Sequence, residues 1–322
     1  MKIFIKLPTW LGDAVMASAA LRALFSHFRG AQFVLYGSFV ALELFRECEN
    51  VHPVFERKKG RFGHFLKLRQ EWGEFDHAFF FRGALSARIQ KLLLRSKRKA
   101  LFDKNQNKNA HQVLKYLHFV EDALCLPPQD AELFLPIKAF GALGGEARRL
   151  LCEKFELDGG KKWLGISAGA KYGSAKCWDR EHFARVALEL GAEYEVLIFG
   201  VASEGEICDF IADTLAKNGV RGVNLCAKTS IKELCHLISN LSLLLANDSG
   251  NMHIASVYKI KTLALFGPTK WTQSAPWQNE NAKILHLNLA CMPCMKRTCP
   301  LKHHKCMRDL SPEMALEAVR DF

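Results

Sequence analysis

The chain has 322 residues, of which 49% are hydrophobic and 24% are charged, and this is enough apolar material for two packed domains of roughly 150 residues each. Such a composition excludes intrinsically disordered and fibrous proteins. The 45 basic and 33 acidic side chains leave a net charge of +12, which indicates an anionic partner such as nucleic acid, anionic lipid or a phosphorylated substrate.

Several features predict a cytoplasmic protein. The longest apolar runs, such as residues 243–246, are far shorter than the ~20 residues of a membrane-spanning helix. Near the N-terminus, Lys6, Pro8 and Asp13 interrupt the continuous apolar stretch that a signal peptide requires. Eleven cysteines, an odd number in an enzyme-sized chain, fit reduced thiols better than a disulfide framework.

Strand and helix patterns alternate along the first half of the chain, which predicts a parallel sheet with helical connections. The alternating apolar residues at 1–8 predict a strand, and the Ala-rich stretch at 14–25 has helical spacing. The further elements expected here are strands at 32–37 and 77–81, a helix at 40–46 and a helix that ends near Leu94.

The pattern changes around residues 134–160, where proline, glycines and a charged helical piece at 146–155 precede a new strand. We therefore expect two domains, 1–155 and 156–322. The second domain repeats the alternation and ends in a Cys-rich loop and a final helix. Its expected strands are 163–167, 194–199, 241–246 and 262–266, and its expected helices are 180–190, 204–218, 231–239 and 252–258.

This alternation predicts an α/β fold of two Rossmann-like domains that face a central cleft. Ligands of such sheets bind beyond the carboxyl ends of the strands, where loops meet helix N-termini. The candidate loops are 8–13, 167–178, 199–204, 246–253 and 266–274.

The loop 246–253 joins a predicted strand to a predicted helix, so it directs free backbone N–H groups and the positive end of a helix dipole at an anion. A diphosphate is the natural occupant. Gly250 allows close backbone approach, Ser249 and His253 can donate hydrogen bonds, and Asp248 is an acceptor suited to sugar hydroxyls. The alternative interpretation is an ordinary Asp/Ser helix cap.

The loop 167–178 combines small residues with two lysines directly after the second domain's first strand. It lacks the Walker spacing, so nucleoside triphosphate hydrolysis is not indicated. Lys176 could neutralise the charge of a departing diphosphate. A solvated lysine on a glycine-rich turn is the alternative.

Asp13 follows Gly12 at the start of the first predicted helix. An aspartate in this place is typical of an N-cap, which contributes ~1 kcal/mol. It could also act as a general base, because the carboxyl end of the first strand is a ligand-binding edge. The two roles are compatible.

Four cysteines in the C-terminal loop meet the ligand count of a tetrahedral zinc site. Only the first pair has the usual Cys-x-x-Cys spacing, and the later spacings are irregular. A reduced, folded loop is the alternative, and we do not expect zinc. The four residues are Cys291, Cys294, Cys299 and Cys306.

Two basic stretches lie in the first half of the chain, residues 57–61 followed by Lys67 and Arg69, and residues 95–99. Apolar side chains interleave with the first stretch, as in a surface that meets anionic lipid headgroups. No helix-turn-helix, RNP-type or zinc-finger signature is present, so we favour lipid or a phosphorylated glycolipid over nucleic acid. The interleaved residues are Phe62, Phe65, Leu66 and Leu68.

The sequence resembles the lipopolysaccharide heptosyltransferases over essentially its whole length. The second domain matches best, whereas Phe79–Arg82 stands where these enzymes usually carry a Leu-Pro-Asn-Ser-like turn. The matching segments are 7–13, 169–176 with Trp178, 199–200 with Glu204, 247–253, 266–269 and 299–306.

The resemblance implies a GT-B architecture, with an acceptor-side first domain and a second domain that holds the nucleotide-sugar donor. It implies ADP-L-glycero-D-manno-heptose as donor, heptosyl-Kdo2-lipid A as acceptor, inversion at the anomeric carbon and no obligatory metal. Another acceptor, such as Kdo2-lipid A, stays open because donor motifs say little about the acceptor. We expect a monomer at the cytoplasmic face of the inner membrane; a non-catalytic nucleotide-binding or nucleic-acid-binding protein is the alternative outside this class.

The resemblance also assigns roles on the acceptor side and to the leaving group. Asp13 would take the proton from the attacking acceptor hydroxyl, with Thr9 and Gly12 beside it at the substrate. Lys176 would stabilise the departing diphosphate. Backbone donors near Gly173 and Ser174 would assist it.

For the rest of the donor, the resemblance implies that Asp248 holds heptose hydroxyls. A single carboxylate on the attack side and cationic groups on the departing side suit a direct displacement. Retention would need a second nucleophile near the base, and none is evident in these loops. The remaining implied contacts are Ser249, Gly250 and His253 at the diphosphate and Glu204 at the adenosine ribose.

Overall fold

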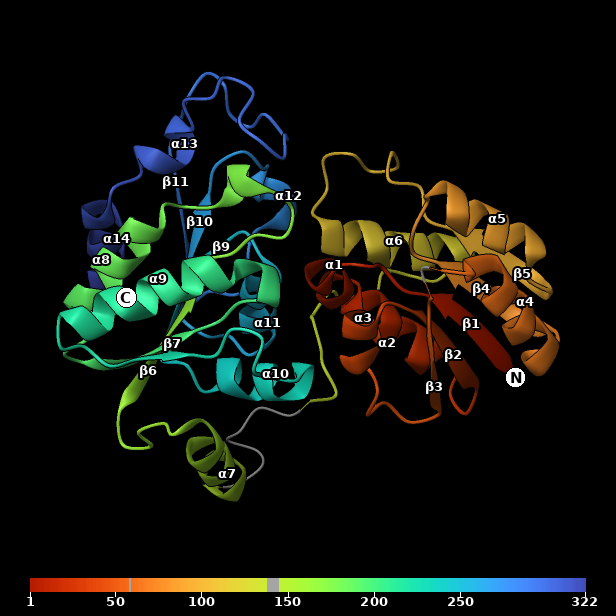
Figure 1. Ribbon diagram of the computed structural model, residues 1–322. Coiled ribbons are helices and arrows are strands. Elements are labelled where there is room, and N and C mark those ends of the chain that lie inside the picture. The colour runs from red at the N-terminus through yellow and green to blue at the C-terminus, as the bar shows by residue number, and fades with distance from the viewer. Residues whose placement is uncertain (58, 138–144) are drawn as a thin grey trace. The chain divides into compact units, whose positions relative to one another are not determined.

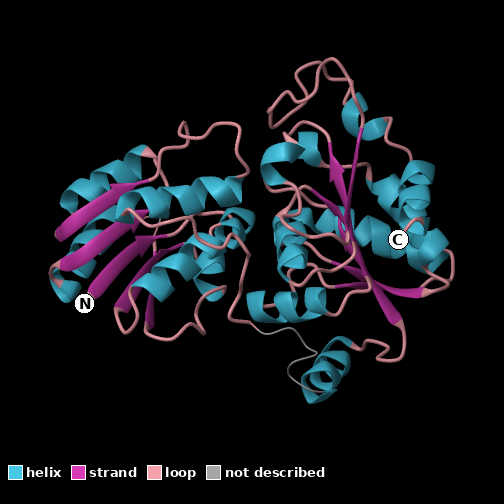
Figure 2. Ribbon diagram, turned by 180° about the vertical axis from the view of Figure 1, so that it is seen from behind, coloured by secondary structure: helices cyan, strands magenta, loops and turns pink. Residues whose placement is uncertain are grey.

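The computed structural model describes residues 1–57, 59–137 and 145–322. The chain divides into two compact units, Met1–Ile137 and Lys138–Phe322. Each unit is a parallel β-sheet with helices packed against it (Figures 1 and 2). The predicted fold class, two Rossmann-like α/β domains of the GT-B type, is confirmed.

Helix α7 (Gly145–Phe155) belongs to the second unit, although the sequence analysis grouped it with the first domain. Its side chains explain the assignment. The Arg148 guanidinium lies 4.6 Å from the ring centroid of Trp163, and Lys154 forms an ion pair with Glu233. Both partners are part of the second unit.

The first sheet has five parallel strands in the order β3-β2-β1-β4-β5. The strands are β1 (Lys2–Lys6), β2 (Gln32–Gly37), β3 (Val51–Phe55), β4 (Phe75–Phe80) and β5 (Ser96–Leu101). The helices are α1 (Leu11–Met16), α2 (Ser18–His27), α3 (Phe39–Glu43), α4 (Arg61–Trp72), α5 (Leu85–Leu93) and α6 (Gln112–Leu124).

Helices cover both faces of this sheet, which is why its central strands are almost continuously apolar. On one face Phe4 of β1 packs against Phe65 of α4, with ring centroids 5.9 Å apart. On the other face Phe79 of β4 packs against Phe119 of α6, with centroids 6.4 Å apart. Successive side chains of a strand point to opposite faces, so one strand supplies both cores.

The edge strands β3 and β5 were not predicted from the sequence. β3 contains Pro53, which lacks the N–H needed inside a sheet and is tolerated at an edge. β5 contains Lys97, Arg98 and Lys99, so the second basic stretch is an edge strand. Charged side chains on an edge discourage pairing with another chain.

The second sheet has six parallel strands in the order β11-β10-β9-β6-β7-β8. Counted from β6, this is the Rossmann order 3-2-1-4-5-6. The strands are β6 (Lys162–Ser167), β7 (Tyr194–Ile198), β8 (Gly222–Asn224), β9 (Leu243–Asn247), β10 (Thr262–Phe266) and β11 (Ala282–His286).

The second unit's helices follow the predicted alternation, with additional short elements before and after β10. The 3-10 turns η2 (Ser174–Lys176) and η3 (Ala202–Glu204) lie in two of the candidate loops. The α-helices besides α7 are α8 (Arg180–Leu190), α9 (Gly205–Lys217), α10 (Ile231–Ser239), α11 (Gly250–Val257), α12 (Trp271–Ser274), α13 (Lys305–Arg308) and α14 (Pro312–Arg320).

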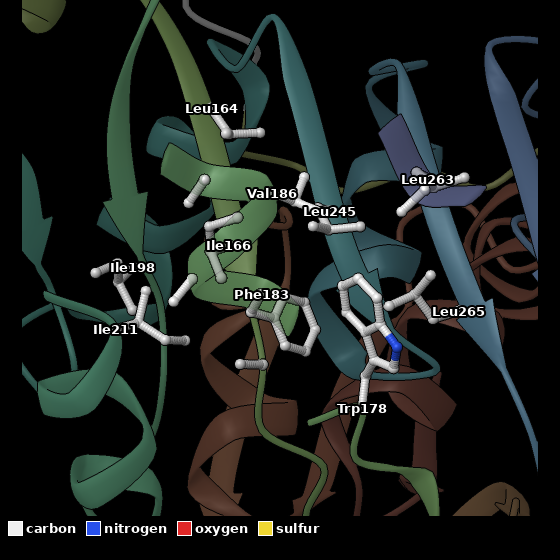
Figure 3. Packing of buried hydrophobic residues seen from close by; sticks show 14 of the residues in the cluster. Leu164, Ile166, Trp178, Phe183, Val186, Ile198, Ile211, Leu245, Leu263 and Leu265 are labelled. Carbon is white, nitrogen blue, oxygen red and sulfur yellow. The ribbon is translucent and has the colours of Figure 1, made fainter. Parts of the chain in front are cut away.

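Trp178 anchors the loop that follows β6 in the core of the second unit. Figure 3 shows its indole beside Phe183, Leu245 and Leu265. It is 2% exposed, its ring centroid lies 5.0 Å from that of Phe183, and its indole N–H donates to the Leu310 carbonyl at 2.7 Å. The far end of the loop 167–178 is therefore fixed by core packing.

Both sheets have a topological switch point, where the chain leaves the central strand for one edge and later returns to build the other half. It lies between β1 and β4 in the first sheet and between β6 and β9 in the second. Ligands of open α/β sheets bind beyond the carboxyl ends of the strands at this point. The positions to examine in each unit are therefore those that follow these strands.

Candidate functional site

Asn247, the last residue of β9, organises the switch point of the second sheet. Its side chain is fully buried, its amide N–H donates to the Ala168 carbonyl at 2.6 Å, and its Oδ1 accepts from the Trp178 backbone N–H at 3.1 Å. One side chain thus holds both ends of the loop that carries Lys176. The sequence analysis quoted Asn247 in a motif and did not assign it a role.

Asp248, the next residue, accepts two strong hydrogen bonds on one oxygen. Lys176 Nζ lies 2.5 Å from Asp248 Oδ2, and the Thr269 hydroxyl donates to the same atom at 2.7 Å. Asp248 and Thr269 are 6% and 7% exposed. A buried carboxylate is tolerated because a cation and a hydroxyl pair with it.

The structure thus brings together two predicted residues, Lys176 and Asp248, and adds Thr269, which the sequence analysis missed. The Lys176 side chain is 13% exposed, and its Nζ lies 4.8 Å from the ring centroid of Tyr172. This burial excludes the alternative of a solvated lysine. Thr269 could have been found from its position, since it closely follows an apolar strand in one of the candidate loops.

Ser249 and Gly250 lie where the sequence analysis expected them, at the start of α11. Ser249 is the N-cap residue, but its side chain makes no capping hydrogen bond. Its Oγ lies instead 3.4 Å from Ser167 Oγ, and Ser167 Oγ accepts from Asn251 Nδ2 at 3.0 Å. Ser249 therefore occupies the N-cap position without the side-chain capping bond, and its hydroxyl lies beside that of Ser167 at the end of β6. His253 lies further along α11 and is 3% exposed.

Glu204 lies against the loop 167–178. Its Oε2 accepts from the Val201 backbone N–H at 2.9 Å, at the start of η3. A Cβ atom added to Gly169 would lie 2.0 Å from Glu204 Cδ, so the carboxyl group packs directly on the backbone of that glycine. Glu204 is thereby positioned near the end of β6.

Gly173 and Ser174 belong to the part of the loop that packs against the backbone of Arg297. A Cβ atom on Gly173 would lie 2.3 Å from the Arg297 carbonyl oxygen, so only glycine allows this approach. The Ala175 N–H donates to that same oxygen at 3.0 Å. Ser174 begins η2, which delivers Lys176 to Asp248.

Asp13 lies in the first turn of α1, after the first strand of the first unit. Trp10 occupies the N-cap position, so the expected N-cap role of Asp13 is wrong, although a negative charge in the first turn still interacts favourably with the helix dipole. The Tyr116 hydroxyl donates to Asp13 Oδ1 at 3.5 Å. Burial, and next the charge of Asp13, raise the pKa of Tyr116 well above its usual value, so Tyr116 stays a phenol.

Thr9 shares the loop of Asp13 with Gly12, and it binds a residue that the sequence analysis did not assign. Its Oγ1 accepts from Arg82 Nη1 at 2.6 Å, and Arg82 follows β4 on the other side of the switch point. Within the described residues Arg82 forms no ion pair with a carboxylate. The sequence did offer a signal for Arg82, because a basic residue shortly after an apolar strand lies at the ligand-binding edge of a parallel sheet.

A second buried pair, Lys6 and Glu56, lies at the same edge of the first sheet. Lys6 Nζ is 2.8 Å from Glu56 Oε1, which also accepts from Gln90 Nε2 at 3.2 Å. Burial lowers the pKa of Lys6 although Glu56 acts to raise it. Burial acts to raise the pKa of Glu56, but Lys6, Gln90 and Arg61 outweigh it, and the pKa is lowered.

The four cysteines of the C-terminal loop gather around one small cavity. Burial, and next the neighbouring thiols, raise the pKa of Cys306 to about 11. Within the described ranges, no three His, Cys, Asp or Glu side chains are grouped so that they could hold a metal ion. The cavity is lined by Cys291, Cys294, Cys299 and Cys306 with His303 and His304.

Two of the four apolar residues that were expected to form a lipid-facing surface with the first basic stretch are instead buried. Phe65 and Leu68 belong to the core of the first unit, at 0% and 3% exposure, whereas Phe62 and Leu66 of the same helix α4 are 40% and 39% exposed. Their spacing places the two pairs on different faces of the helix. Across residues 1–57, 59–137 and 145–322, none of the helices has the length and apolar character needed to cross a bilayer.

Comparison with known proteins gives a consistent result. The sequence pattern of glycosyltransferase family 9 (heptosyltransferase) matches residues 73–305. A Campylobacter jejuni subsp. jejuni serotype O:6 protein named lipooligosaccharide heptosyltransferase 2 is 50% identical over 325 residues, which cover 99% of this chain and 98% of that protein. A Haemophilus influenzae protein of the same name is 25% identical over 347 residues, which cover 100% of this chain and 99% of that protein.

The fold is also found among solved structures. The structure of E. coli ADP-heptose LPS heptosyltransferase II superposes with a TM-score of 0.79 at 21% identity, and the match covers 100% of this chain and 98% of that chain. A glycosyltransferase of family 9 from Veillonella parvula also gives 0.79, at 16% identity, with 99% and 96% covered. At these identities the likeness describes the fold.

Proposed function

Because this chain belongs to glycosyltransferase family 9, the heptosyltransferases, we propose that it transfers L-glycero-D-manno-heptose from ADP-heptose to the first heptose of heptosyl-Kdo2-lipid A. This is a step in building the inner core of lipopolysaccharide or lipooligosaccharide. The observation that carries the proposal is the buried cluster of Lys176, Asp248 and Thr269 at the switch point of the second sheet. Two relatives named lipooligosaccharide heptosyltransferase 2 support the choice of acceptor.

The donor fits the second unit on chemical grounds. Lys176 is a cation that can meet the diphosphate, and the N-terminus of α11 offers backbone N–H groups from Gly250 onward. Asp248 has a carboxylate whose Oδ2 is already engaged, so Oδ1 is the oxygen assigned to heptose hydroxyls. Ser249 and His253 are assigned to the diphosphate.

The nucleoside would lie at the side of Glu204, which we assign to the adenosine ribose. Its carboxyl group packs on Gly169, at the end of β6 and next to the phosphate-binding loop. We assign backbone donors near Gly173 and Ser174 to the diphosphate, although the Gly173 N–H itself already donates to the Ala170 carbonyl at 3.1 Å. Carboxylates suit ribose hydroxyls because they accept hydrogen bonds from two neighbouring oxygens.

The reaction we propose is a direct displacement that inverts the anomeric carbon. The acceptor hydroxyl oxygen attacks C1 of the heptose, its proton goes to Asp13, and the bond from C1 to the diphosphate oxygen breaks with release of ADP. The Tyr116 hydroxyl orients the Asp13 carboxylate. Lys176 neutralises the charge that develops on the leaving diphosphate, so no metal is required for this step.

On the acceptor side we assign Arg82 to an anionic group of the inner core. Its guanidinium is held by Thr9 on the loop of Asp13, and a charged fork of this kind suits carboxylate or phosphate oxygens. Gly12 lies in the first turn of α1 with Asp13, and we assign it to the acceptor side because glycine has no side chain there. The acceptor would therefore be recognised by charge near the proposed base.

We further propose that the protein acts as a monomer at the cytoplasmic face of the inner membrane. Helix α4 exposes Phe62 and Leu66, and the exposed basic residues Arg57 and Lys67 lie close to them in the sequence. Apolar side chains flanked by cations are typical of surfaces that rest on anionic lipid. The net charge of +12 acts in the same direction.

The deciding experiment measures ADP release from ADP-heptose with two acceptors, heptosyl-Kdo2-lipid A and Kdo2-lipid A. We expect release with the heptosylated acceptor only. Release with Kdo2-lipid A only would instead make this the enzyme that adds the first heptose. No release with either would overturn the proposed donor or acceptor, and displacement of ADP by short DNA would favour a nucleic-acid-binding role.

A further inference from the structure

The Cys-rich segment, residues 291–306, holds the backbone of Ala175 at both of its polar groups. The Ala175 N–H donates to the Arg297 carbonyl at 3.0 Å, and the Ala175 carbonyl accepts from His304 Nε2 at 2.9 Å. Ala175 is 2% exposed, so these groups would otherwise be buried without partners. The next residue in the chain is Lys176, which binds Asp248.

The same segment also contacts Tyr172, near Lys176, and Pro268, next to Thr269. The Tyr172 hydroxyl donates to the Met295 carbonyl at 3.0 Å, and the Met295 N–H donates to the Pro268 carbonyl at 2.8 Å. Pro268 directly precedes Thr269. The Tyr172 ring also makes two cation–π contacts, with centroid distances of 4.8 Å to Lys176 Nζ and 5.3 Å to the Arg297 guanidinium.

The loop needs such support because of its own composition. Residues 168–175 include two glycines, which lose much conformational entropy when they are fixed, and three alanines and a serine, whose small side chains supply little packing. Asn247 and Trp178 fix the two ends of this loop. The Cys-rich segment supplies the hydrogen bonds in the middle, next to Lys176.

We infer that the Cys-rich segment is a brace for the donor loop and that His304 is a positioning residue of the donor site. The inference rests on the proposed role of Lys176 at the diphosphate. His304 reaches Lys176 through the backbone of Ala175 and has no assigned contact with substrate. Donation to a carbonyl requires the proton on Nε2, which fixes the tautomer of this imidazole.

The neighbouring histidine provides a matched control. His303 Nδ1 accepts from the Lys305 backbone N–H at 3.0 Å, which is a local bond within the same segment. The two histidines are adjacent in sequence and line the same cavity, but within the described residues only His304 forms a hydrogen bond to the donor loop. Substitution of each should therefore have different consequences.

The test compares His304→Ala, His304→Gln and His303→Ala in the full-length protein. Amide hydrogen exchange of peptides covering residues 170–177 reports on the loop without ligand, and steady-state kinetics give KM for ADP-heptose and kcat. We expect faster exchange in His304→Ala and a donor KM about fivefold higher, the effect of losing one hydrogen bond, with a smaller change in kcat. Glutamine can donate from its own amide, so His304→Gln should recover most of the loss, and His303→Ala should behave as wild type.

Wild-type exchange and donor KM in His304→Ala would overturn the inference, as would a His304→Gln variant no better than alanine. Should His304→Ala fail to fold, Tyr172→Phe tests the same brace, because it removes only the bond to Met295 and should also speed exchange. Faster exchange in the variants together with no heptose transfer by the wild type would reject the proposed function and leave the brace standing.

Discussion

At the scale of single residues, the geometry of Asp248 depends on a hydroxyl contributed from the loop that follows a different strand, β10. Thr269 Oγ1 and Lys176 Nζ both bind Oδ2, so the carboxylate cannot rotate without losing one of them. Fixed orientation matters at a sugar-binding carboxylate because misplaced acceptors lose hydrogen-bond strength steeply with angle. Thr269 therefore belongs to the proposed donor site although it has no assigned contact with substrate.

Replacement of Thr269 by valine keeps the volume and removes the hydroxyl. We expect KM for ADP-heptose to rise about fivefold, as the loss of one hydrogen bond of ~1 kcal/mol predicts. Thr269→Ser should restore most of the wild-type value. Steady-state kinetics at saturating acceptor give both numbers, and an unchanged donor KM in the valine variant would contradict the positioning role.

Glu56 predicts a pH-dependent contribution to stability in the first unit. Burial by itself raises its pKa, but Lys6 and the other partners lower the pKa in the folded protein below that of the unfolded chain. This contribution is therefore fully present above the unfolded pKa of about 4.3 and is lost as the pH falls through the lower folded value.

Glu56→Gln should lower the free energy of unfolding by about 3 kcal/mol at pH 7, because Lys6 then stays buried without its counter-ion. The difference from wild type should shrink as the pH falls below the unfolded value of about 4.3 and through the lower folded pKa, where Glu56 itself becomes protonated. Urea unfolding at pH 7 and at pH 3.5 measures both quantities. Glu71→Gln, at an exposed position of α4, serves as the control, and a pH-independent difference would contradict the ion-pair explanation.

At the scale of elements, helix α4 separates its apolar residues between the core and the surface. Phe65 and Leu68 are buried against the first sheet, and Phe62 and Leu66 are exposed one turn apart. An exposed aromatic and aliphatic pair with basic neighbours is a defined candidate for lipid contact, whereas the basic residues of β5 have a structural role at a sheet edge.

We therefore predict that Phe62→Ser combined with Leu66→Ser weakens binding to vesicles containing anionic phosphatidylglycerol, measured by flotation at low salt. Wild-type binding should itself fall as salt is added, because charge attraction is screened. Leu150→Ser changes an exposed leucine of α7 in the other unit and should leave flotation unchanged. If the double variant floats as well as wild type, α4 is ordinary surface.

At the scale of the whole molecule, the proposed base and the proposed donor groups belong to different units. Asp13 lies in Met1–Ile137, and Lys176 and Asp248 lie in Lys138–Phe322. Each set is built on the switch point of its own sheet. Binding of the nucleotide and removal of the acceptor proton should therefore be separable by mutation.

Asp13→Asn should bind ADP as the wild type does and lose about 10²- to 10⁴-fold in kcat, the range expected for a general base. Lys176→Ala should instead weaken ADP binding. Calorimetric titration with ADP and the turnover assay distinguish the two effects. Near-normal turnover in Asp13→Asn would remove Asp13 as the base, and unchanged ADP affinity in Lys176→Ala would remove that residue from the diphosphate site.

The sequence by itself determined the alternation of strands and helices, and with it the Rossmann-like class of both domains, because hydrophobic periodicity is a local property. Strands at 32–37 and 262–266 and helices at 180–190 and 231–239 have the predicted bounds. The edge strands β3, β5, β8 and β11 were missed, since short strands with Pro53, lysines or few apolar residues carry a weak local signal.

Only the tertiary structure decided which side chains meet. Lys176 and Asp248 lie 72 positions apart in the chain, and Ala175 and His304 lie 129 apart, so no local pattern relates them. The tertiary structure also revealed the roles of Thr269, Arg82 and the Lys6–Glu56 pair. In each sheet, parallel strands bring their carboxyl ends to the same edge, and residues distant in sequence meet there. Local sequence selects which loops can bind a ligand, whereas strand order selects the partners within each loop's reach.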